Sequence, residues 1–162
     1  MRPTADRMNQ VLHQLNSTGV VPPDVVLGTV VALIADGTLT NVTGHLTTKN
    51  EPPSTTWTVF GQLGAALMYV RAAAPIFDWD TESVFFKFDL EAWLRPLSSV
   101  QSITVRDVEV RTQGAKPWMV SPVYEVAFVD GTTLVLAPRK NADEDEWGRI
   151  EAITASIRGA IS

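Results

Sequence analysis

The stretch that decides the fold is residues 124–161, which read YEVAFVDGTTLVLAPRKNADEDEWGRIEAITASIRGAI. Its first part alternates apolar and polar residues on either side of Asp130-Gly131, a pair that commonly closes a β-hairpin. Pro138 then ends the strand pattern, and a strongly patterned helix follows. A hairpin that leads directly into a helix indicates a sheet covered by that helix.

The register of this hairpin follows from its large side chains, which are Tyr124, Val126, Phe128, Leu134 and Leu136. Side chains alternate between the two faces of a strand. A two-residue loop would put the two leucines on the face opposite the other three. A three-residue loop ending at Gly131 pairs Val126 with Leu134 and Tyr124 with Leu136, so all five share one face. We predict this loop, because glycine adopts the left-handed conformation it needs and a one-residue slip would expose an apolar face.

The closing helix is predicted to begin at Asp143 as N-cap, with Glu146 three residues later as in a capping box. Acidic residues favour the positive end of a helix dipole, so we interpret the run 143–146 as capping rather than as a metal site. One apolar stripe recurs at spacings of three and four, and its members are Trp147, Ile150, Ile153, Ile157, Ala160 and Ile161.

The composition is that of an ordered globular protein. The chain has 162 residues, 45% of them hydrophobic and 19% charged, and no cysteine, which excludes a disulfide framework and a thiol nucleophile. The net charge of −5 disfavours nucleic acid and anionic membrane as partners. The longest apolar run, residues 25–35, is shorter than the ~20 residues of a membrane span. We therefore expect a cytoplasmic protein without a membrane span.

The N-terminal region is predicted to be an amphipathic helix with a linker, residues 1–21, ahead of a single β-rich domain, residues 22–162. The apolar stripe of the helix consists of Met8, Val11, Leu12 and Leu15. A helix this short needs a docking surface. Docking on the parent domain is the ordinary interpretation, and a contact with a protein partner or a second copy is the sharper one. These four are the candidate interaction residues.

The composition of the next segments predicts mainly strands. Residues 25–35 are rich in β-branched side chains and predict a buried strand, with a helix begun by Pro23-Asp24 as the competing interpretation. Further strands are predicted over residues 38–48, 55–60, 65–72 and 83–90, with loops at 49–54 and 61–64 and one helical turn at 89–94.

Residues 100–112 show a shift in their apolar alternation. Ile103 and Val105 lie on one face of a regular strand, whereas Val108 and Val110 lie on the other. An extra residue near Arg106 restores a common face, so the pattern predicts a β-bulge or a strong bend.

The fold class that these segments predict is mainly β (α+β): a bent antiparallel sheet or partly open barrel of seven to eight strands, with a C-terminal amphipathic helix and a short N-terminal helix. The strand series 55–136 and the helix from Asp143, with Trp147 in its first turn, resemble a pleckstrin-homology-like (PH-like) domain. The resemblance implies a barrel plugged by the helix and binding of peptides or self-assembly. Phosphoinositide binding is not carried over, because loop 61–64 has no basic residue.

No motif with catalytic or metal-binding spacing is present. The two histidines, His13 and His45, have no patterned acidic partner, and Asp78, Asp80 and Glu82 are most simply solvated loop acids. We therefore predict no cofactor, no metal and no catalytic residue. Five tryptophans remain as core or recognition residues. Trp57 and Trp147 have the strand or helix phase of core residues, whereas Trp79, Trp93 and Trp118 lie in connections, where an exposed ring would mark a recognition surface.

The function predicted from these features is a non-catalytic interaction module that binds a protein partner or assembles with itself. The alternative is a small-ligand carrier or an enzyme with its site in the barrel mouth, where Asp78, Asp80 or His45 would line the rim.

Overall fold

The structure is a computed structural model that describes residues 5–16, 21–75, 89–111, 119–138 and 144–162. The chain forms two compact units, Met1–Arg95 and Pro96–Ser162. Within the first unit, the N-terminal helix shares a hydrophobic core with the elements that follow residue 21.

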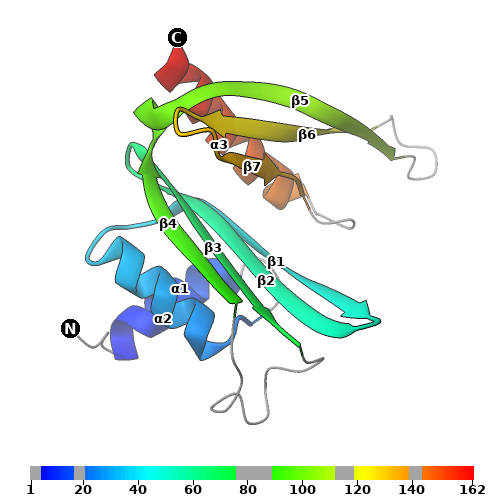
Figure 1. Ribbon diagram of the computed structural model, residues 1–162. Helices are drawn as coiled ribbons and strands as arrows, with labels where there is room; N and C mark the ends of the chain where they lie inside the picture. The colour runs from blue at the N-terminus through cyan, green and yellow to red at the C-terminus, as the bar shows by residue number, and fades with distance from the viewer. Residues whose placement is uncertain (1–4, 17–20, 76–88, 112–118, 139–143) are drawn as a thin grey trace. The chain divides into compact units, whose positions relative to one another are not determined.

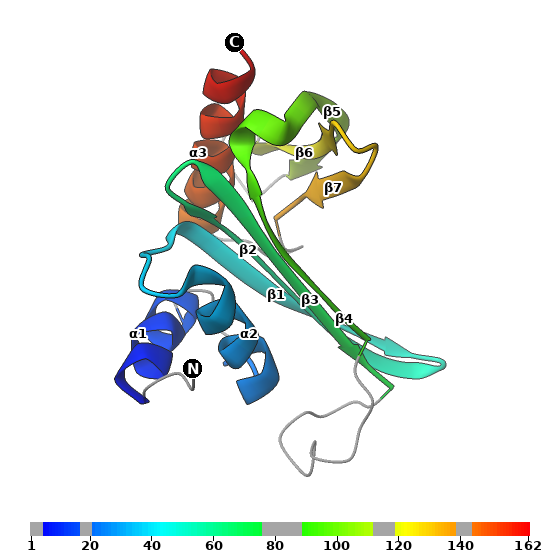
Figure 2. The same cartoon turned by 60° about the vertical axis from the view of Figure 1, so that its left-hand side comes forward.

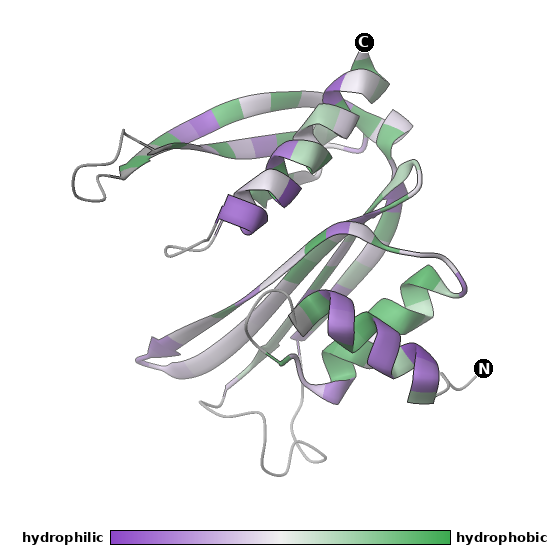
Figure 3. Ribbon diagram, turned by 180° about the vertical axis from the view of Figure 1, so that it is seen from behind, coloured by the Kyte–Doolittle hydropathy of each residue, from purple (hydrophilic) through white to green (hydrophobic). Residues whose placement is uncertain are grey.

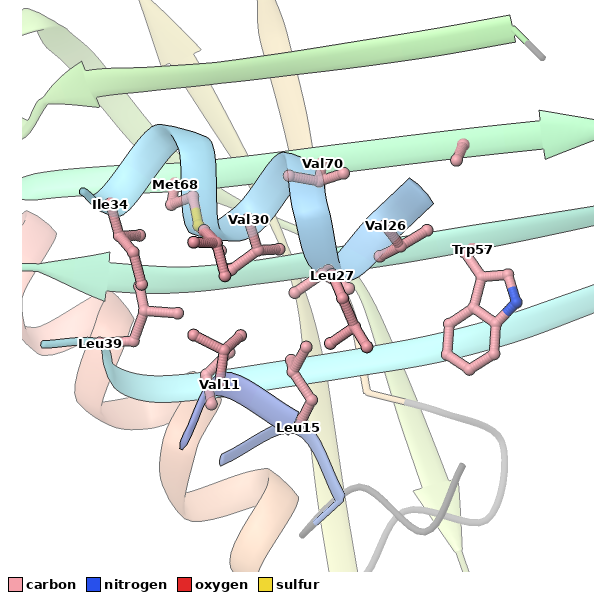
Figure 4. Close-up of a cluster of buried hydrophobic side chains, with 14 of the residues drawn as sticks. Val11, Leu15, Val26, Leu27, Val30, Ile34, Leu39, Trp57, Met68 and Val70 are labelled. Carbon is pink, nitrogen blue, oxygen red and sulfur yellow. The ribbon is translucent and has the colours of Figure 1, made fainter. Parts of the chain in front are cut away.

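The first unit contains the helices α1 (Ala5–Asn16) and α2 (Asp24–Ile34) and the strands β1 (Thr40–Asn50), β2 (Pro53–Leu63), β3 (Ala66–Ala74) and β4 (Asp89–Pro96). The strands form one sheet in the order β1-β2-β3-β4, with antiparallel pairing of β1 to β2 and β2 to β3 (Figures 1 and 2). Both helices pack on one face of it. Their shared core includes Val11, Leu15, Val30, Trp57 and Val70 (Figure 4).

The prediction of a strand over residues 25–35 is wrong, and the competing helix is observed as α2. Its first N–H groups, on Val26 and Leu27, donate to the carbonyl oxygen of Pro23 at 2.9 and 3.1 Å. The buried residues are Val26, Leu27, Val30, Val31 and Ile34, which recur with the helical period. In Figure 3, α2 is hydrophobic almost throughout, whereas α1 alternates with hydrophilic turns. β-Branched residues lower helix propensity only slightly, and burial outweighs that preference here.

Two predictions in the first sheet also differ from the structure. The β2–β3 turn lies at Gly64, and Gly61 belongs to β2, where a Cβ would meet the Val42 Cα at 3.3 Å. Residues 89–94, predicted as a helical turn, lie in β4. Of the predicted strand 83–90, residues 83–88 lie outside the described residues, and the last two lie in β4.

The second unit contains β5 (Val100–Arg111), β6 (Met119–Phe128), β7 (Thr133–Leu136) and α3 (Glu144–Ile161), with a short 3-10 turn, η2 (Leu97–Ser99), before β5. The strands form an antiparallel sheet in the order β5-β6-β7. Figure 1 shows α3 across one face of this sheet, and the β5–β6 ribbon running beyond β7.

The predicted hairpin register is confirmed. Tyr124 pairs with Leu136 and Val126 with Leu134. The Phe128 N–H donates to the Thr132 carbonyl oxygen at 2.9 Å, which closes the three-residue loop. Gly131 has the expected positive φ of 83°.

Two glycines of this unit should respond oppositely to alanine. Gly131→Ala should lower the free energy of unfolding by about 1–2 kcal/mol, because a Cβ disfavours its left-handed backbone even though the space around it is open. Gly148→Ala should raise it by about 0.5–1 kcal/mol, because Gly148 lies in α3 with nothing within 4 Å of an added Cβ. Urea unfolding of both variants measures the two values, and a loss of stability in Gly148→Ala would contradict the backbone argument.

The predicted bulge is also confirmed. The β5–β6 register shifts between Val105 and Asp107, which leaves Arg106 as the extra residue, and a second shift lies between Val100 and Ser102. Past the bulge, Val108 pairs with Pro122 and Val110 with Val120. Directly paired residues point to the same face, so the bulge returns both valines to the face of Tyr124.

α3 holds this face through its buried stripe, which consists of Glu146, Trp147, Ile150, Ile153, Thr154 and Ile157. The Tyr124 hydroxyl donates to Glu151 Oε1 at 2.7 Å, and Arg158 Nη2 donates to the same hydroxyl at 3.3 Å. Burial and the carboxylate of Glu151 raise the pKa of Tyr124, so the phenol stays protonated and keeps its donor. The predicted N-cap, Asp143, lies outside the described residues.

The fold is therefore mainly β, with a C-terminal and an N-terminal helix as predicted. The described residues form seven strands in two separate sheets rather than one bent sheet, and no closed barrel. α2 is an additional helix that the prediction of fold class omitted.

Candidate interaction surface

The stripe of α1 that we predicted as a contact lies in the core of the first unit. Val11 and Leu15 are fully buried, and Met8 and Leu12 are partly buried against the same cluster. Docking on the parent unit, the ordinary interpretation of this helix, is thus confirmed. Val11 and Leu15 leave no apolar surface for a partner.

A different apolar surface lies on the half of the β5–β6 ribbon that is farther from the β6–β7 loop. Val105, Val108, Val110 and Val120 are 56%, 45%, 54% and 60% exposed, and we call these four residues the valine face. All four share the face of Tyr124 through their pairing. Nearer to the β6–β7 loop, the same face is buried at Val126 and Phe128. The valine face is thus the uncovered continuation of the unit's own apolar surface.

One edge of the ribbon is closed to a further strand by two prolines. Because the Phe128 N–H points toward β7, every second residue back along β6 turns its backbone groups to that side, which brings position 122 to this edge. Pro122 has no N–H to donate. The ladder with β7 ends at Tyr124 and Leu136, and the next hydrogen-bonded pair of this register would join Pro122 to Pro138. Neither residue can donate, so pairing stops there.

The other edge is blunted by the bulge. The backbone N–H and C=O groups of Tyr124 face β7 and not β5. Its partner Val105, and Val108 beyond the bulge, therefore turn their own N–H and C=O groups to the outer edge of β5, away from β6. The Val108 N–H is already bonded at 2.7 Å to the Oδ1 atom of Asp107. A bulge and an occupied N–H are common protections of an edge strand. Access to the ribbon is therefore through its face.

A second group of polar and aromatic side chains lies on the first sheet, on the face away from α1 and α2. Tyr69 stacks on Trp93 with ring centroids 5.1 Å apart, and the Arg95 guanidinium lies 4.9 Å from the centre of the Trp93 ring. Arg71 forms an ion pair with Asp89 at 3.0 Å. Burial, and secondarily the charge of Glu91, raises the pKa of Tyr69. These side chains already contact one another, whereas the side chains of the valine face are exposed to solvent. The valine face is therefore the better candidate for a partner contact.

The residues weighed for chemistry do not form a site in the described part of the chain. His45 lies in β1 with its ring edge-on to Phe60 at 6.2 Å. Asp78, Asp80 and Glu82 lie outside the described residues. Within the ranges that the structure describes, no three His, Asp or Glu side chains are grouped to hold a metal ion.

Three of the five tryptophans lie in the described part of the chain. Trp57 and Trp147 are buried, which confirms the core role expected of both. Trp93, expected in a connection, lies on strand β4 and is partly exposed. Trp79 and Trp118 lie outside the described residues.

Comparison with known proteins finds no match: no family model, no curated protein and no solved structure resembles this chain. The resemblance to PH-like domains therefore stays a prediction. Among the described helices, none has both the length and the apolar character to cross a membrane.

Proposed function

We propose that this protein is a non-catalytic interaction module that binds a protein partner or assembles with itself through the valine face. The observation that carries the proposal is that four valines, each about half exposed, are gathered on one side of a two-stranded ribbon. Scattered apolar residues are ordinary on a protein surface, whereas a contiguous group on one face marks a contact. The PH-like resemblance agrees with this role, because such domains often bind peptides or form oligomers.

The energetics favour covering this face. Full burial of a valine side chain contributes about 1.5–3 kcal/mol, so completing the burial of a half-exposed valine is worth roughly 1 kcal/mol. Four such residues together supply about 4 kcal/mol, which offsets only the lower end of the ~4–15 kcal/mol that association costs, so the partner must add contacts beyond the four valines. A two-stranded ribbon with an open apolar face is also only marginally stable without packing. A partner would therefore stabilise the ribbon as well as bind it.

The test is a charge placed within the valine face, at the end that lies farthest from Tyr124. Val110→Glu should weaken assembly or partner binding by about 100-fold or more, because the contact would desolvate an unpaired carboxylate. Val110 is 54% exposed in the free protein, so the fold should tolerate the change. Native mass spectrometry of the protein purified gently from its own host would show the wild type as a multiple of the chain mass or with a co-purifying protein.

The matched control is Val135→Glu. Val135 is 40% exposed on β7 and pairs with Glu125, which places it on the opposite face of the same sheet. This variant should keep the wild-type assembly. If Val110→Glu assembles like the wild type, the valine face is not the contact and the proposal fails.

A further inference from the structure

We propose that the occupant of the valine face is an amphipathic α-helix of a partner protein, which packs on the β5–β6 ribbon in the same layer as α3. This inference rests on the proposed function and specifies its partner. The first argument is continuity. α3 already covers the proximal part of this face, where the hydroxyl of Tyr124 bonds to Glu151 and Arg158 lies 5.4 Å from the centre of the Tyr124 ring.

The second argument is size. The valine face extends along β6 from the position of Tyr124, opposite Val105, to Val120, opposite Val110. Four residue steps of a strand span about 14 Å, which equals about nine residues of α-helix. Two strands lie about 4.8 Å apart, and a helix with its side chains is about 10 Å wide. One helix of two to three turns therefore covers the ribbon completely.

The third argument excludes the other occupants. A partner strand would have to extend the sheet at an edge, and Pro122 on one side and the bonded Val108 N–H on the other oppose this. A second copy that stacked its own ribbon on this one would place the two sheets about 10 Å apart. The α3 helix lies on the same face in each copy, so both helices would stand in the way of this stacking. A helix instead continues the existing helix layer.

The chemistry of the partner helix follows from the residues that it would contact. The valine face carries branched apolar side chains and no charge, so the partner should present apolar residues at spacings of three, four and seven. The opposite face of the ribbon carries charged side chains, among them Arg106, which is bonded to Glu125 at 3.4 Å. The partner should accordingly contact one side of the ribbon only.

The experiment is site-specific photo-crosslinking in the full-length chain, expressed in its own host. A benzoylphenylalanine residue is placed singly at Val110 and at Val120, and at Val135 and Val129 as exposed controls. Peptide mass spectrometry then identifies the cross-linked positions. We expect adducts from Val110 and Val120 but not from the controls, on a partner segment whose cross-linked positions recur every three or four residues.

The outcomes separate this inference from the proposed function. Cross-links that recur every second residue would indicate a partner strand, and cross-links to this chain itself would indicate a second copy. Either result overturns the helix and leaves the valine face as the contact. Absence of any adduct specific to Val110 and Val120, together with unchanged assembly of Val110→Glu, overturns both proposals.

Discussion

Replacing Phe128 with alanine should lower the free energy of unfolding of the Pro96–Ser162 unit by about 3–5 kcal/mol. Phe128 is 1% exposed and occupies the end of β6, where it pairs with Val100. Its N–H also closes the loop to β7. Removing a buried phenyl ring forfeits its transfer free energy and leaves a cavity that the surrounding side chains fill only partly.

The measurement has to resolve the two units, because a chain with two compact units need not unfold in one step. Segment-resolved hydrogen exchange reports the opening free energy of β5, β6 and α3 separately from that of the first unit. Val129→Ala is the control, since the neighbouring side chain is 68% exposed and its loss should change stability by less than about 0.5 kcal/mol. Equal effects of the two variants would show that Phe128 does not belong to a packed core.

Local chemistry explains which parts of the second unit could be predicted. Gly131 can adopt a backbone conformation that other residues disfavour, and the large side chains on both strands then admit one register. The bulge at Arg106 was visible for the same reason, because an alternation of period two reveals a single extra residue. Signals of this kind depend only on neighbours along the chain.

The predictions from sequence are wrong where tertiary packing, and not the neighbouring residues, determines the local structure. α2 is built from residues that favour strands, and it is a helix because one side of it buries Val26, Val30 and Ile34 in the core of the first unit. The sequence predicts a turn at Gly61, whereas Gly61 lies in β2, where the strand passes close to Val42. Neither contact can be read from neighbouring residues.

The valine face illustrates the same limit. The sequence shows that Val108 and Val110 belong to the apolar face, but it does not show how far α3 reaches along that face. The β5–β6 ribbon also extends past β7, which ends at Leu136, while β6 begins at Met119. Pro122 and Pro138 were the available signal, since together they end the pairing of β6 with β7.

The first unit should depend as strongly on Leu15. Replacing Leu15 with alanine should cost about 2–5 kcal/mol, because this side chain is 1% exposed in the cluster shared by α1, α2 and the sheet. α1 is also held by polar contacts: Arg7 Nε donates to the Ala35 carbonyl oxygen at 3.1 Å, and Gln14 Nε2 donates to that of Leu39 at 3.3 Å. These bonds tie the helix to the segment between α2 and β1, so loss of packing at Leu15 should loosen that segment too.

Hydrogen exchange of α1, α2 and β1–β3 measures the effect, and His13→Ala on the exposed side of the same helix is the control. We expect faster exchange across all these elements in Leu15→Ala and wild-type exchange in His13→Ala. The two interpretations of α1 are also separated. If Leu15→Ala kept wild-type exchange and instead lost assembly or partner binding, the stripe of Met8, Val11, Leu12 and Leu15 would be the contact. The burial of Val11 and Leu15 leads us to expect the opposite, a loss of stability with the valine face still able to bind.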